Sequence, residues 1–193
     1  MGKEKIGQLS DQEIVKAVLS DLKNYKYIIE RYQGKLLIYI QRAINVNKED
    51  AEDILQEVFI KVYKNLNSYS EEFKFSSWIY RITHNEAISF LRSNHSKIKV
   101  IATDQEKNVF EELASEVDIE AEFIQSSTSV YVHSILSKLD KKYKDVLILR
   151  FIEEMDYAEI SDILHISAGT VGSLINRAKV KFKELINNNE KSI

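Results

Sequence analysis

Apolar residues recur every three or four positions along most of this chain, a period that is typical of amphipathic α-helices. The clearest case runs from Asp50 to Leu66. Its apolar positions form one broad stripe, which consists of Ile54, Leu55, Val58, Phe59, Val62, Tyr63 and Leu66. Two earlier stripes predict helices over 11–22 and 25–44, and Ser10 with Glu13 fits a capping box before the first of them. We expect these stripes to face a common hydrophobic core.

A polar loop over 67–74 follows the central helix, and another helix begins after it. Ser76 or Ser77 is predicted to cap this helix, because serine oxygens accept hydrogen bonds from free backbone N–H groups. Its core-facing positions are predicted to be Ile79, Ile82, Ile88 and Leu91. Trp78 and Tyr80 cannot both share that face, which leaves an aromatic side chain near the mouth of the loop.

Helical periodicity weakens over 93–127 and returns in the last third of the chain. Helices are predicted over 130–139 and 142–151, followed by a short helix that Asp156 and Glu159 introduce with a capping-box pattern. A three-residue turn then leads to a longer helix that Ser167 is predicted to cap. Two helices joined by such a tight turn indicate a helix-turn-helix, although an ordinary three-helix bundle with a basic end has the same pattern.

Composition favours an all-α fold. The chain of 193 residues has no proline and only five glycines, so long helices are uninterrupted and turns that need positive φ are few. Residues 96–128 carry 3 Lys/Arg and 8 Asp/Glu, so this segment has a net charge of −5, whereas the whole chain has a net charge of −3. The chain is therefore predicted to form two small helical domains, residues 1–95 and 129–193, joined by an acidic linker over 96–128.

Several classes of function are excluded by what the chain lacks. There is no cysteine, no apolar run of about 20 residues and no Gly-rich phosphate-binding loop. The four histidines are dispersed, and the polar start at 1–8 does not resemble a signal peptide. We therefore expect a cytoplasmic protein with no catalytic residues, no metal, no cofactor and no membrane insertion of its own.

Two polar strips in the first half are candidate contact surfaces. Asp53, Gln56, Glu57 and Ile60 line up on the outer face of the central helix. Acidic residues also suit the start of a helix, but the helix dipole accounts for Glu49, Asp50 and Glu52 better than for Asp53 and Glu57. In the next helix, Trp78 lies close to Arg81 and Asn85. It could stack on an unpaired base, or it could be a core anchor.

The last long helix presents polar and basic residues on its exposed side. Thr170, Ser173, Asn176 and Arg177 are followed by Lys179, Lys181 and Lys183. Polar groups with cations behind them suit base edges and phosphates of duplex DNA.

Both halves together resemble the sigma-70 family of bacterial RNA polymerase sigma factors, in its two-domain extracytoplasmic-function (ECF) group. The first match is DAEDILQEVFIKVYKNL with FSSWIYRITHNEAISFLR, which is similar to region 2 of the family. The second is LSKLDKKYKDVLILRFIEEMDYAEISDILHISAGTVGSLINRAKVKFKEL, which is similar to region 4. The order of the two matches and the acidic stretch between them also fit the family.

The resemblance assigns roles to the candidate residues. It implies that Asp53, Gln56, Glu57 and Ile60 contact core RNA polymerase at the β′ coiled coil. It implies that residues of the loop and following helix bind and open the minus-ten element, namely Ser68, Phe75, Trp78, Arg81, Asn85 and Arg92. It implies that the second domain reads the minus-thirty-five element with Thr170, Gly172, Ser173, Asn176, Arg177 and Lys179.

The implied partners are core RNA polymerase, through its β′ coiled coil and β flap, promoter DNA and an anti-sigma factor. In the family the linker enters a polymerase channel. The acidic linker here could do the same, or it could be a solvated tether. Within holoenzyme the protein would lie on the nucleoid. A stand-alone helix-turn-helix regulator, which binds duplex DNA without polymerase, is the alternative function.

The chain departs from the family at several positions. Gly172 and Leu174 stand where the family commonly has cations, His165 where glycine is common and Asp140 where proline is common. Because each missing cation removes a DNA contact, we expect weak DNA binding by the isolated second domain or an unusual promoter sequence. A lone histidine at a turn is expected to be structural.

Overall fold

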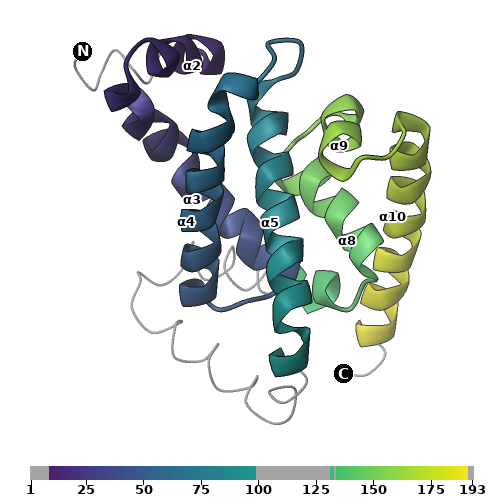
Figure 1. The fold of residues 1–193 in the computed structure, drawn as a ribbon. Helices are drawn as coiled ribbons and strands as arrows, with labels where there is room; N and C mark the ends of the chain where they lie inside the picture. Colours follow the sequence, from purple (N-terminus) through teal and green to yellow (C-terminus); the bar gives the residue numbers. More distant parts are fainter. Residues whose placement is uncertain (1–8, 99–130, 133, 191–193) are drawn as a thin grey trace, which may run out of the picture.

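The computed structural model describes residues 9–98, 131, 132 and 134–190, and every regular element in this part of the chain is helical (Figure 1). The predicted all-α class is confirmed. The elements are α2 (Asp11–Ser20), the 3₁₀ turn η1 (Leu22–Tyr25), α3 (Lys26–Ile44), α4 (Lys48–Asn65), the 3₁₀ turn η2 (Leu66–Ser68), α5 (Phe75–Ile98), α8 (Lys141–Leu147), the π-helical turn η3 (Ile148–Ile152), α9 (Tyr157–Leu164) and α10 (Ala168–Glu190).

The first domain is a bundle of α3, α4 and α5, with α2 across one end (Figure 1). The apolar stripes predicted from the sequence meet in its centre, where Leu36, Val58 and Ile79 are fully buried. Side chains cap the N-termini of the helices by accepting hydrogen bonds from free backbone N–H groups. Ser10 and Glu13 form the predicted capping box, and the Asn47 side chain accepts a hydrogen bond from the Asp50 N–H at 2.8 Å.

The start of α5 differs from the prediction that Ser76 or Ser77 caps it. The helix begins at Phe75, and the Trp78 N–H donates to the carbonyl of Lys74 at 3.2 Å. Both serines are therefore inside the helix. Ser76 donates its hydroxyl to Glu159 at 3.3 Å, whereas the Ser77 hydroxyl is buried with no hydrogen-bond partner among the described residues. A contact with the distant α9, invisible to local sequence rules, determines the role of Ser76.

The second domain contains the predicted helix-turn-helix. Asp156 and Glu159 form a capping box at the start of α9, and His165 ends α9 in the left-handed conformation with φ 54°. The Ser167 hydroxyl accepts the Thr170 N–H at 3.1 Å at the start of α10, as predicted. His165 thus occupies a conformation that glycine adopts more easily, and its structural role at the turn follows from that.

The predicted helix over 142–151 is present, but its second half is π-helical. Helix α8 ends at Leu147 and continues as the π-helical turn η3. Wider hydrogen bonds hold the chain there, from the Glu153 N–H to the Ile148 carbonyl at 3.0 Å and from the Met155 N–H to the Leu149 carbonyl at 3.0 Å. Periodicity did not reveal this widening, because a π turn adds only one residue to a helical pattern.

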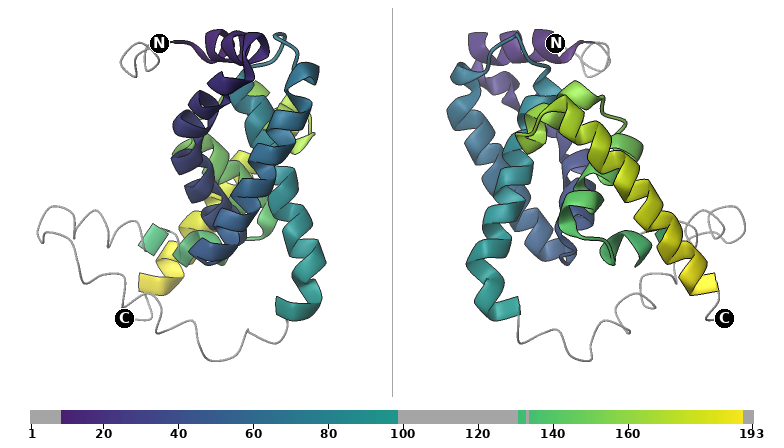
Figure 2. Two further views of the ribbon diagram at one scale, coloured as in Figure 1. Left: turned by 60° about the vertical axis from the view of Figure 1, so that its left-hand side comes forward. Right: turned by 90° about the vertical axis from the view of Figure 1, so that its right-hand side faces the viewer.

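The two domains pack directly against each other, with α9 on α5 and η3 on α3. Figure 1 shows α8 and α9 between α5 and α10. Both views in Figure 2 place the C-terminal ends of α5 and α10 at the same end of the molecule. The acidic linker lies outside the described residues, apart from residues 96–98, which continue α5. None of the described helices combines the length and the apolar character that crossing a bilayer requires.

Candidate polymerase and nucleic-acid interfaces

The outer strip of α4 is exposed along its length. Asp53, Gln56 and Glu57 face solvent, and Ile60 is 44% exposed. On the opposite side of the same helix, Ile54 and Val58 are buried against α3 and α5. Burial of one face fixes the orientation of the helix, so the two carboxylates, the amide and the aliphatic side chain point outward together. This strip can accept charge-assisted hydrogen bonds from a basic partner.

Trp78 belongs to an aromatic cluster where the 67–74 loop meets α5. Its ring centroid is 5.6 Å from that of Phe75 and 5.6 Å from that of Tyr69. Trp78 is 7% exposed and Phe75 is 2% exposed, so both side chains anchor the core in this arrangement. Tyr69 is half-buried and donates its hydroxyl to the Phe73 carbonyl at 2.7 Å, which orders the loop. Tyr69 is not among the residues predicted from the sequence, although an aromatic residue in a polar loop is a usable signal.

The other predicted minus-ten residues are arranged around this cluster. Arg81, Asn85 and Arg92 lie on the same strip of α5 as Trp78, at helical spacing. Asn85 and Arg92 are exposed and Arg81 is half-buried. Ser68 is at the other end of the loop, where its hydroxyl donates to the Asn65 carbonyl at 2.7 Å. The strip therefore presents one cation and one amide, Arg81 and Asn85, within two turns of the buried indole, and a second cation, Arg92, about 21 Å along the helix from it.

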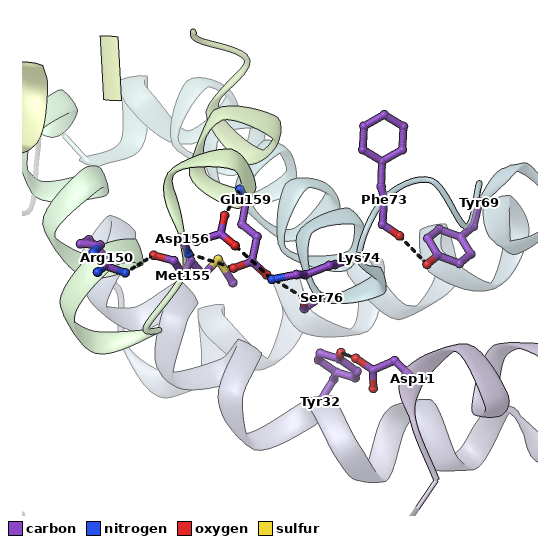
Figure 3. A network of polar contacts seen from close by, with 10 residues as sticks. All are labelled: Asp11, Tyr32, Tyr69, Phe73, Lys74, Ser76, Arg150, Met155, Asp156 and Glu159. Carbon is purple, nitrogen blue, oxygen red and sulfur yellow. Dashed lines mark hydrogen bonds and ion pairs between the residues drawn. The ribbon is translucent and has the colours of Figure 1, made fainter. Parts of the chain in front are cut away.

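A second polar face at the start of α5, which the sequence pattern does not indicate, points toward the second domain (Figure 3). The Lys74 ammonium is 3.1 Å from an Asp156 carboxylate oxygen and 3.4 Å from one of Glu159. These contacts raise the pKa of Lys74, and the bonds that Asp156 receives from the Glu159 N–H and Lys74 lower the pKa of Asp156. Tyr80 donates its hydroxyl to Glu153 at 2.5 Å. Trp78 is buried in the core of the first domain, and Tyr80 is buried as well because the second domain covers it.

A cleft of about 680 Å³ opens beside these contacts. Its walls come from both domains, and its charged lining consists of Asp11, Arg31, Lys35, Arg42, Glu153, Glu154 and Glu159. Burial raises the pKa of Glu153, while the Tyr80 hydroxyl and the charges of Arg42 and Lys35 act in the opposite direction. Cations of the first domain thus face carboxylates of the second.

His84 is part of a buried polar cluster between the domains. The Tyr39 hydroxyl is 2.9 Å from His84 Nδ1, and His84 Nε2 is 4.0 Å from an Asp145 carboxylate oxygen. Burial lowers the pKa of His84 to about 4, even though the charge of Asp145 raises it. The imidazole is therefore neutral at pH 7. The described residues contain no cluster of His, Cys, Asp and Glu that could hold a metal ion.

Four of the predicted minus-thirty-five residues are exposed on the outer side of α10. Thr170, Ser173, Asn176 and Arg177 have this position, at spacings of three or four residues.

The other two predicted residues, Gly172 and Lys179, do not lie on this outer side of α10. Gly172 is half-buried, and a Cβ added there would lie 3.4 Å from the Tyr157 ring. The Lys179 ammonium lies 5.0 Å from the centre of the Phe151 ring, around the helix from Ser173.

Comparison with known proteins gives the family of the chain. The family model "Sigma-70 region 2" matches residues 28–97, and "Sigma-70, region 4" matches residues 129–182. The ECF RNA polymerase sigma-E factor of Haemophilus influenzae is 32% identical, over 89% of this chain and 93% of that protein. The chain belongs to the ECF group of the sigma-70 family. The ECF RNA polymerase sigma factor SigW of Bacillus subtilis is also 32% identical, over 79% of this chain and 83% of that protein.

Two solved structures share the fold of this family member. One is CnrH in complex with the cytosolic domain of CnrY, with a TM-score of 0.66, 21% identity and coverage of 92% of this chain and 97% of the other. The other is the sigma factor RpoE in complex with the anti-sigma factor NepR from Bartonella quintana, with a TM-score of 0.63, 20% identity and coverage of 86% and 98%. The predicted two-domain helical architecture is confirmed.

Proposed function

We propose that this chain is a promoter-specificity subunit that binds core RNA polymerase and directs initiation at a defined set of promoters. The observation that carries the proposal is the exposed strip of Asp53, Gln56, Glu57 and Ile60 on α4, in a chain that also holds an exposed helix-turn-helix. A strip of acceptors beside one aliphatic side chain suits an arginine-bearing helical partner, which here is the β′ coiled coil.

The second domain is the duplex reader in this proposal. The exposed groups Thr170, Ser173, Asn176 and Arg177 lie on α10, the second helix of the helix-turn-helix, which enters the major groove in such motifs. Arginine favours guanine and asparagine favours adenine at base edges. Gly172 and Lys179 face away from this surface, so we assign them supporting positions in the helix rather than base contacts.

Opening of the minus-ten element is assigned to the 67–75 loop and the start of α5. Ser68, Arg81, Asn85 and Arg92 are the groups that an extruded strand can reach, because they are exposed or half-buried. Trp78 and Phe75 form the wall on which this surface rests. Extruding a base costs a few kcal/mol, which contacts of this kind can recover.

The second domain offers a surface for a further partner. An apolar groove of about 350 Å³ is lined by Leu136, Leu147, Phe151, Phe182 and neighbouring residues. An amphipathic helix is the usual occupant of such a groove. The β flap of polymerase is the partner we assign to it in holoenzyme. An anti-sigma factor would compete for the same surfaces, and the solved complex of RpoE with the anti-sigma factor NepR supports a partner of this kind. The site of action is then the cytoplasm, on the nucleoid, and no catalysis is required.

Pull-down of core RNA polymerase tests the proposal. Wild type is expected to bind, and Asp53→Arg with Glu57→Arg is expected to abolish binding, because both acceptors of the strip become repulsive. The matched control is Glu72→Arg with Glu184→Arg, which reverses two exposed acids on other surfaces. Equal binding by both double variants refutes the assigned strip.

A gel shift separates the two functional candidates. A sigma factor of this kind is expected to shift its promoter only in the presence of core polymerase. Strong and specific binding of duplex DNA by the protein alone would instead establish the stand-alone regulator.

A further inference from the structure

Acidic side chains from the segment after η3 and from the first turn of α9 contact the start of α5. Glu153 accepts the Tyr80 hydroxyl at 2.5 Å. Asp156 and Glu159 surround the Lys74 ammonium at 3.1 and 3.4 Å. Glu159 also accepts the Ser76 hydroxyl at 3.3 Å. Figure 3 shows Lys74 and Ser76 pointing at the carboxylates of Asp156 and Glu159. One ammonium and two hydroxyls of the first domain are therefore satisfied by anions of the second.

Helix α3 extends the same donor surface. Lys35 and Arg42 line the cleft, and both charges act on Glu153 by lowering its pKa. Their spacing of seven residues places them on one side of the helix, next to the Tyr80 side of α5. The first domain thus presents toward the second domain a set of cations and hydroxyls, which consists of Lys35, Arg42, Lys74, Ser76 and Tyr80, with the Asp11 carboxylate in the same cleft.

Such a set of donors suits the oxygens of phosphate as well as those of carboxylate. Lysine, arginine and hydroxyl groups make up most protein contacts to a nucleic-acid backbone. Lys74 is also the last residue before α5, next to the loop that we assign to the opened strand. We infer that this donor face binds the backbone phosphates of the opened DNA strand, and that Glu153, Asp156 and Glu159 occupy it in their place while the two domains are packed together.

The spacing of the two promoter elements requires the carboxylates to leave the donor face before DNA phosphates bind there. Elements named minus ten and minus thirty-five are separated by about 25 base pairs, or roughly 85 Å at about 3.4 Å per base pair. The two domains touch at 3.1 Å between Lys74 and Asp156, so this closed arrangement cannot serve both elements. Because the acidic segment is joined to the duplex reader, moving that reader to the far element uncovers the donor face.

The contacts are suited to reversible separation. The side chains of Lys74 and Asp156 are 62% and 54% exposed, and exposed ion pairs contribute little net stability in water. The inference rests on the proposed function, because it deepens the role of the surface beside the 67–75 loop. Its consequence is that the free protein binds single-stranded DNA weakly until the acidic segment leaves.

The test measures binding of fluorescein-labelled single-stranded dT12 to the full chain without polymerase. The variant Glu153→Gln with Asp156→Asn and Glu159→Gln removes three charges. It keeps the cap, since Asn and Gln serve in the same capping positions. We expect affinity at least about tenfold higher than wild type, because the three anions that compete with phosphate for the donor face are removed. The control Asp21→Asn with Glu30→Gln and Glu184→Gln makes the same charge change at exposed sites elsewhere. An equal gain in the control refutes the inference.

Two further measurements locate the effect. Adding Lys74→Gln to the neutralised variant is expected to remove most of the gain; an undiminished gain overturns the inference. The natural chain has no cysteine, so labels on Lys64→Cys and Lys183→Cys can report the distance between the domains. That distance is expected to increase when dT12 binds, and an unchanged distance in the bound state overturns the inference. If wild type binds polymerase but the dT12 results fail, only this inference falls, whereas failure of the pull-down removes the proposed function.

Discussion

Acid should loosen this protein through His84. In the folded chain His84 lies among Tyr39 on α3, Asp145 and Lys141 on α8, and His165 at the turn. Burial lowers its pKa from 6.5 to about 4. The folded state therefore binds fewer protons than the unfolded state between these values, and stability falls as the pH drops through that window.

The size of the effect follows from the shift. About 2.5 pKa units correspond to about 3 kcal/mol once the pH is below both values. Between pH 7.5 and 5.5 only part of this is expressed, about 1 kcal/mol. Glu153 acts in the opposite direction, because burial raises its pKa and its protonation favours the folded state as the pH falls. A difference between wild type and a variant without the imidazole separates the two groups.

The variant is His84→Asn, whose side-chain oxygen can take the place of Nδ1 opposite Tyr39. Urea unfolding at pH 7.5, 6.5 and 5.5 gives the free energy of unfolding of both proteins. We expect wild type to lose about 1 kcal/mol relative to the variant over this range. Parallel pH profiles for the two proteins would refute the placement of a neutral, buried His84.

Three substitutions test local features of the fold by urea unfolding. Leu36→Ala should cost about 2–5 kcal/mol because Leu36 is fully buried, and a cost below about 1 kcal/mol would contradict its core position. Asn47→Ala should cost about 1 kcal/mol through the lost cap on the Asp50 N–H, with Asn47→Asp as the control that keeps it. Gly172→Ala should stabilise by about 0.5–1 kcal/mol, since a helical glycine is replaced and the new Cβ just meets the Tyr157 ring at 3.4 Å. A loss of stability would show that the Tyr157 ring cannot move away from the new Cβ.

Much of the fold could be predicted from the sequence because it depends on local rules. The apolar stripe of α4 and the capping boxes at Ser10 and Asp156 each involve residues within a few positions of one another. The start of α5 could not be predicted in this way. Ser76 has its partner Glu159 in the other domain, and no periodicity within one helix reveals that contact.

The candidate surfaces also differ in whether local rules or distant contacts determine them. Exposure of Asp53, Gln56 and Glu57 follows from helical periodicity alone, and the structure shows it; their contact with polymerase stays a prediction. The outward positions of Ser173 and Arg177 follow in the same way. The acidic contacts of Glu153 and Asp156 with α5 depend on how two separately folded bundles dock, which the spacing of residues within either bundle does not encode.

The aromatic cluster at the start of α5 also makes the molecule its own optical reporter. Trp78 is the only tryptophan in the chain, and it packs against Tyr69 and Phe75 at the junction with the loop. Excitation near 295 nm, where tyrosine absorbs little, therefore samples the environment of this one indole. The emission wavelength and the quenching of Trp78 fluorescence therefore report conformational changes of the loop in solution without an attached dye. Changes that are confined to the second domain leave this fluorescence unaltered.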